Sequence, residues 1–540
     1  MPLLNWVNRN QAEETADQVP YHLLKFEKSY GDSEKAKENL IIQGDNLQAL
    51  KALLPLYGGQ VKCVFIDPPY NTKQAFENYD DKLEHAQWLS TMYPRVQLLR
   101  ELLSNEGSIF IQLDDNQLDY MKVMCDEIFG RKNFINRITV DVRAPSAFST
   151  VNKGVFKATE YLLWYGKNKE QTAIPKLRVK RDPDYAYDKW IENIEELPEK
   201  WIITSLSDSF NEKVKLRTNK PNKIIESFNR FIVKNSSNII RLASISDSKA
   251  GKDIVDLKNK SIASNDVIYS LERNGYEDIY IINGQQILFY NKNVSNLDGE
   301  EEATKLLTNI WYDIAWEGIA KEGSVIFKKG KKPEKLIKRC LELASNEGDI
   351  VVDSFLGSGT TAAVAHKMGR RYIGIEMGDH AKTHVIPRLK RVVDGEQSGI
   401  SDNVDWLGGG GFNFYTLGSP VFDEQGFLHS DVSFSDLAGY LWWLETYTSL
   451  GLSSNMTSPF LGVHEGVAYY LLYNGVLGDR RPKSGNVLTN PILKYLNECH
   501  QHEGKRIIIG EATRIGTAKL ETLNIEFKQI PYALYGSQAK

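Results

Sequence analysis

The sequence predicts an α/β fold built on an open, mostly parallel sheet. Three apolar segments, residues 61–66, 349–353 and 371–376, lack helical periodicity and have the length of buried strands. The first stops at two prolines, and the second runs into a Gly-x-Gly turn followed by a helical pattern. Because open α/β sheets bind ligands at the carboxyl ends of their strands, the residues that follow these segments are the candidate site residues.

Length and composition indicate a chain with several hydrophobic cores. Its 540 residues are 41% hydrophobic and 25% charged, and this length predicts about three or four domains. No run of about 20 apolar residues is present, and the N-terminus lacks the charged and apolar regions of a signal peptide. We therefore expect a soluble, cytoplasmic protein with no membrane association.

Cysteine spacing and net charge bear on whether the chain binds metal or nucleic acid. Cys63, Cys125, Cys340 and Cys499 are far apart and lack the spacing of metal ligands, so we expect buried thiols and no metal site. The formal net charge is −4. Any surface for nucleic acid must therefore be a local basic face on an acidic protein.

The first part of the chain shows alternating strand and helix patterns. Residues 1–38 are polar and mixed in charge, which indicates a partly helical arm. A strand and turn at 40–46 precede a helical leucine pattern at 47–54. Further along, the pattern predicts helices at 88–104 and 116–129 and strands at 108–115, 134–142 and 161–165.

The turn after the strand at 61–66 carries the most distinctive chemistry, in Asp67, Pro68, Pro69 and Tyr70. Two prolines restrict their own φ angles and those of the residues before them, so a carboxylate and a ring are held in one arrangement. An ordinary proline turn with a solvated Asp67 is the simpler interpretation. The tetrapeptide resembles the catalytic motif of amino-group DNA methyltransferases, which methylate an exocyclic nitrogen of adenine or cytosine.

A second unit, far downstream, indicates a nucleotide-type pocket. A strand, a glycine turn and a helix amino terminus allow a ligand to approach the backbone closely. A second strand then places an acid, Glu376, where such folds bind ribose hydroxyls. The unit resembles the S-adenosylmethionine motif of the same methyltransferases, which implies cofactor contacts by Asp353, Phe355, Gly357, Gly359, Thr360 and Glu376.

The order of the motifs resembles the permuted β class of amino methyltransferases, with the catalytic strand before the cofactor motif. This resemblance implies a Rossmann-like S-adenosylmethionine-dependent methyltransferase core, with a permuted, mostly parallel seven-stranded sheet, an inserted target-recognition domain and a C-terminal α+β domain. It implies further cofactor contacts by Asp45, Lys332 and Pro333. The simpler alternatives are a helix cap at Asp45 or Asn46, and a solvated basic loop that caps a helix at Pro333.

Residues 170–310 differ in character from the segments on either side. Lysine and arginine alternate with apolar residues there, which predicts a basic strand face suited to phosphate contacts. A charge run is usually a solvated face, but the family places its recognition domain at this position. The candidate DNA-binding residues are Lys176, Arg178, Lys180, Arg181, Lys213, Lys215 and Arg217.

The chain after the cofactor motif resembles the modification (Mod) subunit of type III restriction-modification systems, through residues 396–401 and 406–412. That family uses its C-terminal region for dimerisation and for contact with a restriction subunit. Without the resemblance, four successive glycines read as a flexible linker. The expected domains are an arm (1–38), a catalytic half (39–169), a recognition domain (170–310), a cofactor half (311–395), a Gly-rich connector (396–419) and an assembly domain (420–540).

The resemblance implies methyl transfer from S-adenosylmethionine to N6 of adenine in duplex DNA. Asp67 and the Pro68 carbonyl would accept the two N6 hydrogens and aim the nitrogen lone pair. Tyr70 would stack on a flipped base. The alternatives are N4-cytosine methylation and a catalytically silent DNA-recognition subunit.

Overall fold

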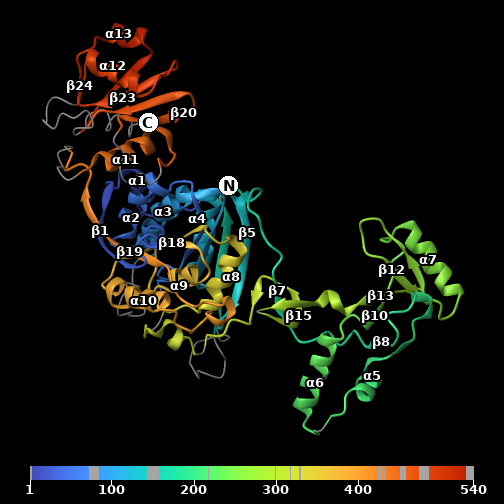
Figure 1. Ribbon diagram of the computed structural model, residues 1–540. Coiled ribbons are helices and arrows are strands. Elements are labelled where there is room, and N and C mark those ends of the chain that lie inside the picture. The colour runs from blue at the N-terminus through green and yellow to red at the C-terminus, as the bar shows by residue number, and fades with distance from the viewer. Residues whose placement is uncertain are drawn as a thin grey trace. The chain divides into compact units, whose positions relative to one another are not determined.

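The computed structural model describes residues 3–71, 84–142, 157–216, 218–297, 299–316, 318–327, 330–423, 428–429, 432–450, 458–473 and 486–530. The chain forms two compact units, Met1–Pro175 with Asn309–Lys540, and Lys176–Thr308 (Figure 1). The second unit occupies the part of the sequence where an inserted domain is expected at 170–310.

A ten-stranded sheet is the centre of the larger unit. Its strand order is β1-β19-β2-β18-β17-β3-β4-β6-β5-β16. The bounds are β1 (His22–Gly31), β19 (Gly411–Pro420), β2 (Leu40–Gln43), β18 (Arg371–Glu376), β17 (Ile350–Asp353), β3 (Val61–Ile66), β4 (Leu103–Leu113), β6 (Thr159–Gly166), β5 (Phe134–Asp141) and β16 (Ile310–Trp311).

The seven strands from β2 to β5 form the mostly parallel sheet that the sequence predicts. Strands β2, β18, β17, β3 and β4 run parallel to their neighbours, whereas β6 is antiparallel to both β4 and β5. The predicted α/β class is therefore confirmed. Three further strands, β1, β19 and β16, extend the sheet at its two edges.

The extension at one edge comes from the two segments expected to be an arm and a connector. Strand β19 pairs parallel with β2, and β1 pairs antiparallel with β19. Gly408, Gly409 and Gly410 have φ angles of 100°, 108° and 76°, so they form a turn that few other residues could adopt. A Cβ on Gly411 would lie 2.6 Å from the Tyr30 carbonyl oxygen, which explains the fourth glycine. The glycine run therefore leads into a sheet strand instead of a flexible linker.

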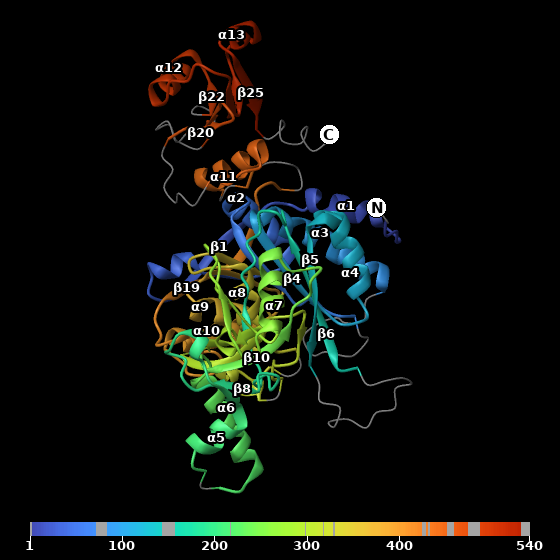
Figure 2. The same ribbon diagram turned by 90° about the vertical axis from the view of Figure 1, so that its right-hand side faces the viewer.

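Helices cover both faces of this sheet (Figures 1 and 2). On one face, Val64 and Ile66 of β3 join a buried cluster that also includes Leu50 and Val96. On the other face, Cys63 of β3 lies towards α8, which carries Cys340. The helices of this unit's core are α1 (Arg9–Gln18), α2 (Asn46–Tyr57), α3 (His85–Leu102), α4 (Leu118–Cys125), α8 (Glu334–Ala344), α9 (Thr360–Lys367) and α10 (Ile386–Val393).

The C-terminal region adds a smaller sheet with the order β20-β21-β23-β25. Strands β21, β23 and β25 run parallel, with α12 and α13 between them in sequence, and α11 packs against α2 through Trp443. Of the four cysteines, Cys63, Cys125 and Cys340 are buried as expected, but Cys499 at the end of α12 is exposed. The elements are α11 (Phe434–Thr446), β20 (Phe460–His464), β21 (Val467–Leu471), β22 (Val487–Leu488), α12 (Asn490–Cys499), β23 (Arg506–Gly510), β24 (Ala512–Thr513), α13 (Thr517–Thr522) and β25 (Ile525–Gln529).

The second unit contains a six-stranded antiparallel sheet, β11-β12-β13-β10-β8-β9, and a three-stranded sheet, β14-β15-β7. Aromatic side chains, including Trp190 and Tyr290, fill its core. Its elements are β7 (Arg178–Lys180), β8 (Lys189–Ile191), β9 (Ile203–Ser205), α5 (Leu206–Lys213), α6 (Pro221–Lys234), β10 (Ile239–Ser244), α7 (Lys252–Ala263), β11 (Tyr269–Leu271), β12 (Ile279–Ile282), β13 (Gln285–Phe289), β14 (Val294–Leu297) and β15 (Glu300–Leu306).

Candidate active site

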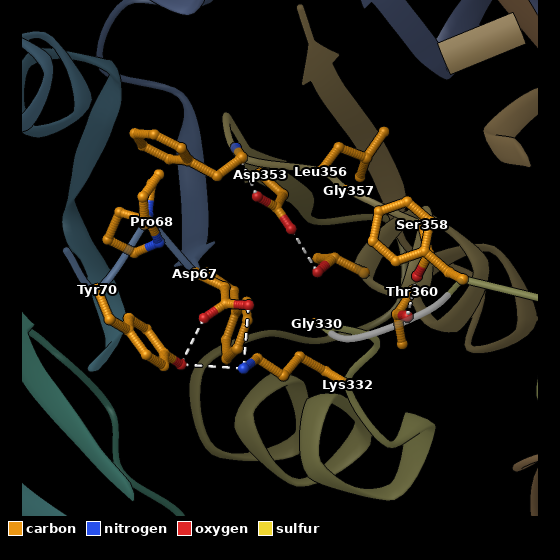
Figure 3. A pocket seen from close by; sticks show the side chains of 15 residues that line it. Asp67, Pro68, Tyr70, Gly330, Lys332, Asp353, Leu356, Gly357, Ser358 and Thr360 are labelled. Carbon is orange, nitrogen blue, oxygen red and sulfur yellow. Dashed lines mark hydrogen bonds and ion pairs between the residues drawn. The ribbon is translucent and has the colours of Figure 1, made fainter. Parts of the chain in front are cut away.

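The two motifs that are far apart in the sequence meet at neighbouring strand ends. Strand β3, which leads to Asp67, pairs parallel with β17, which ends at Asp353. The residues after both strands line one cavity (Figure 3). Its wall consists of Phe65, Asp67, Pro68, Pro69, Tyr70, Phe327, Gly330, Lys332, Asp353, Phe355, Leu356, Gly357, Ser358, Thr360 and Thr361.

This cavity gathers the predicted catalytic residues and part of the predicted cofactor set. Asp67, Pro68, Pro69 and Tyr70 all line it. Of the cofactor candidates, Lys332, Asp353, Phe355, Gly357 and Thr360 line it as well. Asp45, Pro333, Gly359 and Glu376 lie outside the wall as the described residues form it. Phe65, Phe327 and Ser358 are wall residues that the motifs did not indicate.

Both oxygens of the Asp67 carboxylate have a partner. The Tyr70 hydroxyl lies 2.6 Å from Oδ1, in position to donate to it, and the Lys332 ammonium lies 3.1 Å from Oδ2 (Figure 3). Lys332 also donates to the Tyr70 hydroxyl oxygen at 2.9 Å. The Trp88 indole donates to the Pro69 carbonyl at 2.8 Å, which anchors the turn between these residues. The carboxylate is therefore oriented from both sides.

Glu160 completes this group, and the motifs did not identify it. Its Oε2 lies 3.0 Å from the Tyr70 hydroxyl and 3.4 Å from the Lys332 ammonium, and it accepts a hydrogen bond of 2.6 Å from Gln112. Glu160 is near the start of β6, an antiparallel strand. Because β6 runs opposite to β4, its beginning lies at the edge of the sheet where β3 and β4 end. The sequence shows an acid before an apolar strand, but only the direction of that strand places the acid beside Tyr70 and Lys332. We name Asp67, Tyr70, Glu160 and Lys332 the polar quartet.

The quartet holds two carboxylates and one ammonium in a largely buried place. The side chains of Asp67, Glu160 and Lys332 are 18%, 13% and 9% exposed. Burial raises the pKa of Asp67, with a contribution from Glu160 that Lys332 opposes. Burial opposes the charge of Lys332, but the two carboxylates outweigh it and raise the pKa of that ammonium. Burial and both carboxylates raise the pKa of Tyr70 well above its usual value, so its proton is retained.

The glycine turn is organised by two acids. Asp353 accepts hydrogen bonds from the Phe355 backbone N–H at 2.9 Å and from the Thr361 hydroxyl at 2.6 Å. Burial raises the pKa of Asp353 to about 7. Glu376, at the end of β18, accepts from the Gly357 backbone N–H at 2.7 Å. The acid predicted to bind ribose thus supports the turn, whose Gly357 has a φ of 56°, and its ribose contact remains a prediction.

Asp45 is a helix cap. Its carboxylate accepts hydrogen bonds from the backbone N–H groups of Leu47 and Gln48 at the start of α2, and it pairs with Arg95 at 3.2 Å. The neighbouring Asn46 amide donates to the Ser354 carbonyl at 2.8 Å and so joins α2 to the glycine turn. A cofactor contact by Asp45 remains a prediction.

Lys331 and Lys332, directly before α8, are buried and not solvated. Pro333 is the N-cap residue of α8. Lys331 donates to three backbone carbonyls, including that of Val325 at 3.0 Å, and burial lowers its pKa to about 8. Lys332 faces the Asp67 and Glu160 carboxylates, so its predicted cofactor role would be shared with its role in the quartet.

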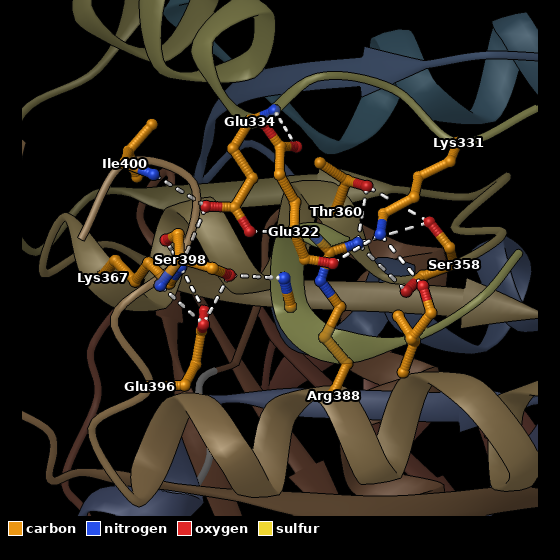
Figure 4. A network of polar contacts seen from close by, with 12 residues as sticks. Glu322, Lys331, Glu334, Ser358, Thr360, Lys367, Arg388, Glu396, Ser398 and Ile400 are labelled. Carbon is orange, nitrogen blue, oxygen red and sulfur yellow. Dashed lines mark hydrogen bonds and ion pairs between the residues drawn. The ribbon is translucent and has the colours of Figure 1, made fainter. Parts of the chain in front are cut away.

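A buried ionic network braces the cofactor half behind the cavity (Figure 4). The Arg388 guanidinium donates to the Thr360 hydroxyl at 2.8 Å and to Glu334 at 2.7 Å. Glu334 also accepts from Lys367 at 2.9 Å and from the Ile400 backbone N–H at 3.1 Å. Residues 396–401, noted only as a signature in the sequence, therefore hold the start of α8 and, through Arg388, the glycine turn.

The predicted DNA-binding cations of the second unit lie on separate elements. Arg178 in β7 donates to Thr304 at 2.8 Å, and Lys180 pairs with Glu302 of the adjacent β15. Lys213, at the end of α5, pairs with Glu192 at 3.0 Å. The Arg181 guanidinium donates to the Asp182 carbonyl at 3.0 Å, Lys176 and Lys215 are exposed, and Arg217 lies outside the described residues. The alternating pattern thus produces a strand whose cations are partly neutralised by an acidic neighbour.

The structure also bears on metal binding and on membrane insertion. No cluster of three or more His, Cys, Asp or Glu side chains suited to a metal occurs among the residues that the structure describes. Within the same residues, no helix has the length and apolar character needed to cross a membrane.

Comparison with known proteins adds sequence relatives to this geometry. A family described as DNA methylase matches residues 61–240 and 228–386, together more than half of the chain. A Haemophilus influenzae protein described as "Probable type III restriction-modification enzyme HindVI Mod subunit" is 35% identical over 416 residues, 72% of this chain. The type III restriction-modification enzyme EcoPI Mod subunit of Escherichia phage P1 is 28% identical over 410 residues, 67% of this chain. The chain spans 55% and 60% of those two relatives.

Among solved structures, the chain is similar to one described as PvuII DNA methyltransferase, cytosine-N4-specific. The TM-score is 0.33 with 16% identity, over 71% of this chain and 96% of that one.

Proposed function

This chain belongs to the DNA methylase family, and we propose that it transfers a methyl group from S-adenosylmethionine to N6 of adenine in duplex DNA. One observation carries the proposal: the Asp67–Tyr70 turn and the glycine turn after Asp353 line a single cavity. A nucleophile-aiming group and a nucleotide-type turn on neighbouring parallel strands are what a group transfer between two bound molecules needs.

The cavity fits the cofactor chemically. Gly357 in the glycine turn allows close approach to the backbone. Phe327, Phe355 and Leu356 supply apolar wall. The acids Asp67 and Asp353 give this wall a negative character that suits a sulfonium cation. When bound there, S-adenosylmethionine would supply an electrophilic methyl group.

The chain's own residues would aim the acceptor nitrogen. The adenine N6 lone pair is delocalised into the ring, so the nitrogen has to be oriented before it can attack. Asp67 and the Pro68 carbonyl would accept its two hydrogens and direct the lone pair, and orientation supplies much of the acceleration. Tyr70 would offer its ring to a base that has left the helical stack, since a stacked base cannot reach the cavity.

Product analysis tests this proposal. The protein is incubated with S-adenosylmethionine and duplex DNA, the DNA is digested to nucleosides, and the methylated nucleoside is identified by mass spectrometry. N6-methyladenine is the expected product. N4-methylcytosine would support the alternative amino acceptor, and no methylated nucleoside would support a silent recognition subunit. An Asp67→Ala chain is the control for background activity.

We propose roles in DNA recognition and in assembly for the remaining parts of the chain. We propose that residues 176–308 recognise double-stranded DNA, with phosphate contacts from the exposed Lys176 and Lys215 and from Arg178, Lys180, Arg181, Lys213 and Arg217. The support is the lysine- and arginine-rich insertion between the two motifs. Filter binding at several salt concentrations checks it, because each lost phosphate contact lowers the salt dependence of binding.

The Mod subunits among the relatives suggest the partners. We propose that the chain forms a homodimer through residues 420–540 and can bind a type III restriction subunit, in the nucleoid of a prokaryotic cytoplasm. Light scattering of the full chain, alone and mixed with a restriction subunit from the same system, tests both interactions.

A further inference from the structure

The polar quartet has more hydrogen-bond acceptors than protons to share among them. The Tyr70 hydroxyl has one proton, but two carboxylate oxygens lie within reach, Asp67 Oδ1 at 2.6 Å and Glu160 Oε2 at 3.0 Å. When the hydroxyl points at one carboxylate, its oxygen faces the other without a proton between them. The Lys332 ammonium, which contacts all three groups, offsets that repulsion, and the Gln112 amide adds a hydrogen bond to Glu160 Oε2. The network can therefore accept one additional proton, between the Tyr70 oxygen and one of the two carboxylates.

The proposed reaction produces such a proton. When the new carbon–nitrogen bond forms and the carbon–sulfur bond breaks, N6 becomes positively charged and carries two hydrogens in addition to the methyl group. One of these hydrogens has to leave as a proton. The mechanism described so far uses Asp67 only to aim N6 and leaves the destination of the proton open.

We propose that Glu160 is the terminal acceptor of this proton, and that the Tyr70 hydroxyl passes it on from Asp67. The N6–H electron pair stays on N6 and restores a neutral amine, while the proton moves to Asp67. Asp67 then protonates the Tyr70 oxygen as Tyr70 gives its own proton to Glu160. Tyr70 is again a hydroxyl and Asp67 again a carboxylate, so only Glu160 has changed. This inference rests on the proposed function and deepens it.

The charges of the site support this route. Asp67, Glu160 and Lys332 sum to −1, which balances the positive charge that N6 carries after transfer. Moving the proton to Glu160 keeps the total at zero, so no unbalanced charge is created in a buried place. Two other acids act on the quartet electrostatically, Asp353 through Asp67 and Asp114 through Glu160, and both disfavour additional negative charge there.

Glu160 is also suited to pass the proton to water. Its side chain is 13% exposed, and it is held by the neutral amide of Gln112, whose 2.6 Å hydrogen bond fixes the carboxylate without competing for a proton. Neither residue belongs to the cavity wall. Glu160 can therefore exchange with solvent without opening the place where the base would bind.

The test compares proton release with methyl transfer in one turnover. Methyl transfer is followed by rapid quench, and proton release by an indicator dye in weakly buffered solution. In the unmodified chain the two should coincide. In Tyr70→Phe, which keeps the ring, and in Glu160→Gln, proton release should lag behind transfer by at least tenfold. Tyr161→Phe is the matched control, because its hydroxyl bonds to Thr159 and not to the quartet.

Three outcomes are informative. A lag in both variants and none in Tyr161→Phe supports the route. Coincident transfer and release in both variants overturns it, with the proton leaving Asp67 directly to water. Absence of methyl transfer in the unmodified chain would instead refute the proposed function.

Glu160→Asp decides the matter if the two variants do not fold, because it keeps the charge that pairs with Lys332 but withdraws the carboxylate from the Tyr70 hydroxyl. A lag of proton release behind methyl transfer in this variant supports the Tyr70 step, whereas coincident transfer and release overturn it.

Discussion

At the scale of single residues, the charged and hydroxyl groups of the site hold one another in orientation. Asp67 is oriented through both of its oxygens, by Tyr70 and by Lys332, and Glu160 is tied to the same two partners. Orientation of this kind costs no reorganisation at the moment of reaction. The consequence is that isosteric changes which remove one charge should harm catalysis much more than folding.

Replacing Asp67 by Asn tests that consequence. The amide keeps the size of the side chain but loses the charge that aims N6, so single-turnover methylation should fall by at least about a hundredfold, as for the loss of one preorganised contact. Cofactor binding measured by calorimetry should survive and weaken far less than the rate falls, because Asp353 remains in the cavity wall. Asp115→Asn, at an exposed pair with Lys157, is the control and should retain full activity. A near-normal rate in Asp67→Asn would remove Asp67 from its assigned role.

The raised pKa of Asp353 predicts a pH dependence of stability. In the folded chain this pKa is about 7, above its usual value of 3.8, so the folded state binds more protons between these values than the unfolded state. Stability from this group is therefore fully present below about pH 4 and is lost as pH rises through about 7. Asp353→Asn lacks this loss, so its free energy of unfolding should increase relative to the unmodified chain from pH 4 to 7.

Denaturant unfolding of both chains at several pH values measures this difference. It should level off above pH 7, where Asp353 is ionised in both states. A difference that stays constant from pH 4 to 8 would contradict the pKa assignment. Saturating cofactor should reduce the difference, because a sulfonium cation near Asp353 favours the ionised form.

At the scale of elements, the segment 396–401 holds buried charged side chains in place, and we call it the brace. It supplies the Ile400 backbone N–H to Glu334, and the Ser398 carbonyl to Lys367 at 2.9 Å. Glu334 and Arg388 are fully buried, so each of these charges requires its partner. The brace joins three helices to the glycine turn, and its packing leaves no space for another atom at Gly399.

Gly399→Ala should therefore be destabilising. The added Cβ would lie 2.1 Å from Glu334 Oε2, and the φ of 64° is unfavourable for alanine. We expect a loss of about 1–3 kcal/mol in the free energy of unfolding and a weaker affinity for S-adenosylmethionine, because Arg388 connects Glu334 to Thr360. Thermal unfolding and calorimetry measure the two effects.

Gly516→Ala is the matched control, since its Cβ would meet nothing within 4 Å and its φ is −66°. It should leave both quantities close to those of the unmodified chain. If Gly399→Ala behaved like this control, the brace would not support the cofactor half.

At the scale of the whole molecule, the cavity lies in one unit of the chain and the inserted residues form the other. The cavity and the quartet belong to the unit that contains the ten-stranded sheet, and the residues Lys176–Thr308 form a unit with its own aromatic core. A chain organised in this way should allow the second unit to be exchanged without loss of the reaction.

Exchanging residues 176–308 for the corresponding insertion of a related enzyme tests this separation. The chimera should methylate a different DNA sequence but produce the same modified base, as read by sequencing that detects methylated bases. A chimera with the donor's residues 432–530 is the control and should keep the original sequence. Methylation of the original sequence by the first chimera would assign recognition to another part of the chain.

Local sequence determined much of the fold. The strands at β3, β17 and β18 are apolar runs that end at prolines or glycines, and those residues restrict or permit backbone angles irrespective of the rest of the chain. The same local rule identified Asp67 to Tyr70 and the glycine turn, because each motif lies within one strand end. The helix cap at Asp45 is also a local property.

Tertiary structure decided what depends on the direction and order of strands. Glu160 reaches Tyr70 and Lys332 only because β6 is antiparallel, and Lys332 pairs with both carboxylates because its segment forms part of the cavity wall. The glycine run at 408–411 leads into β19 because β19 pairs with the edge of β2. No local pattern predicts that pairing. The sequence by itself thus determined the two motifs, whereas only long-range pairing decided which other charges surround them, since contact between distant segments depends on the whole sheet.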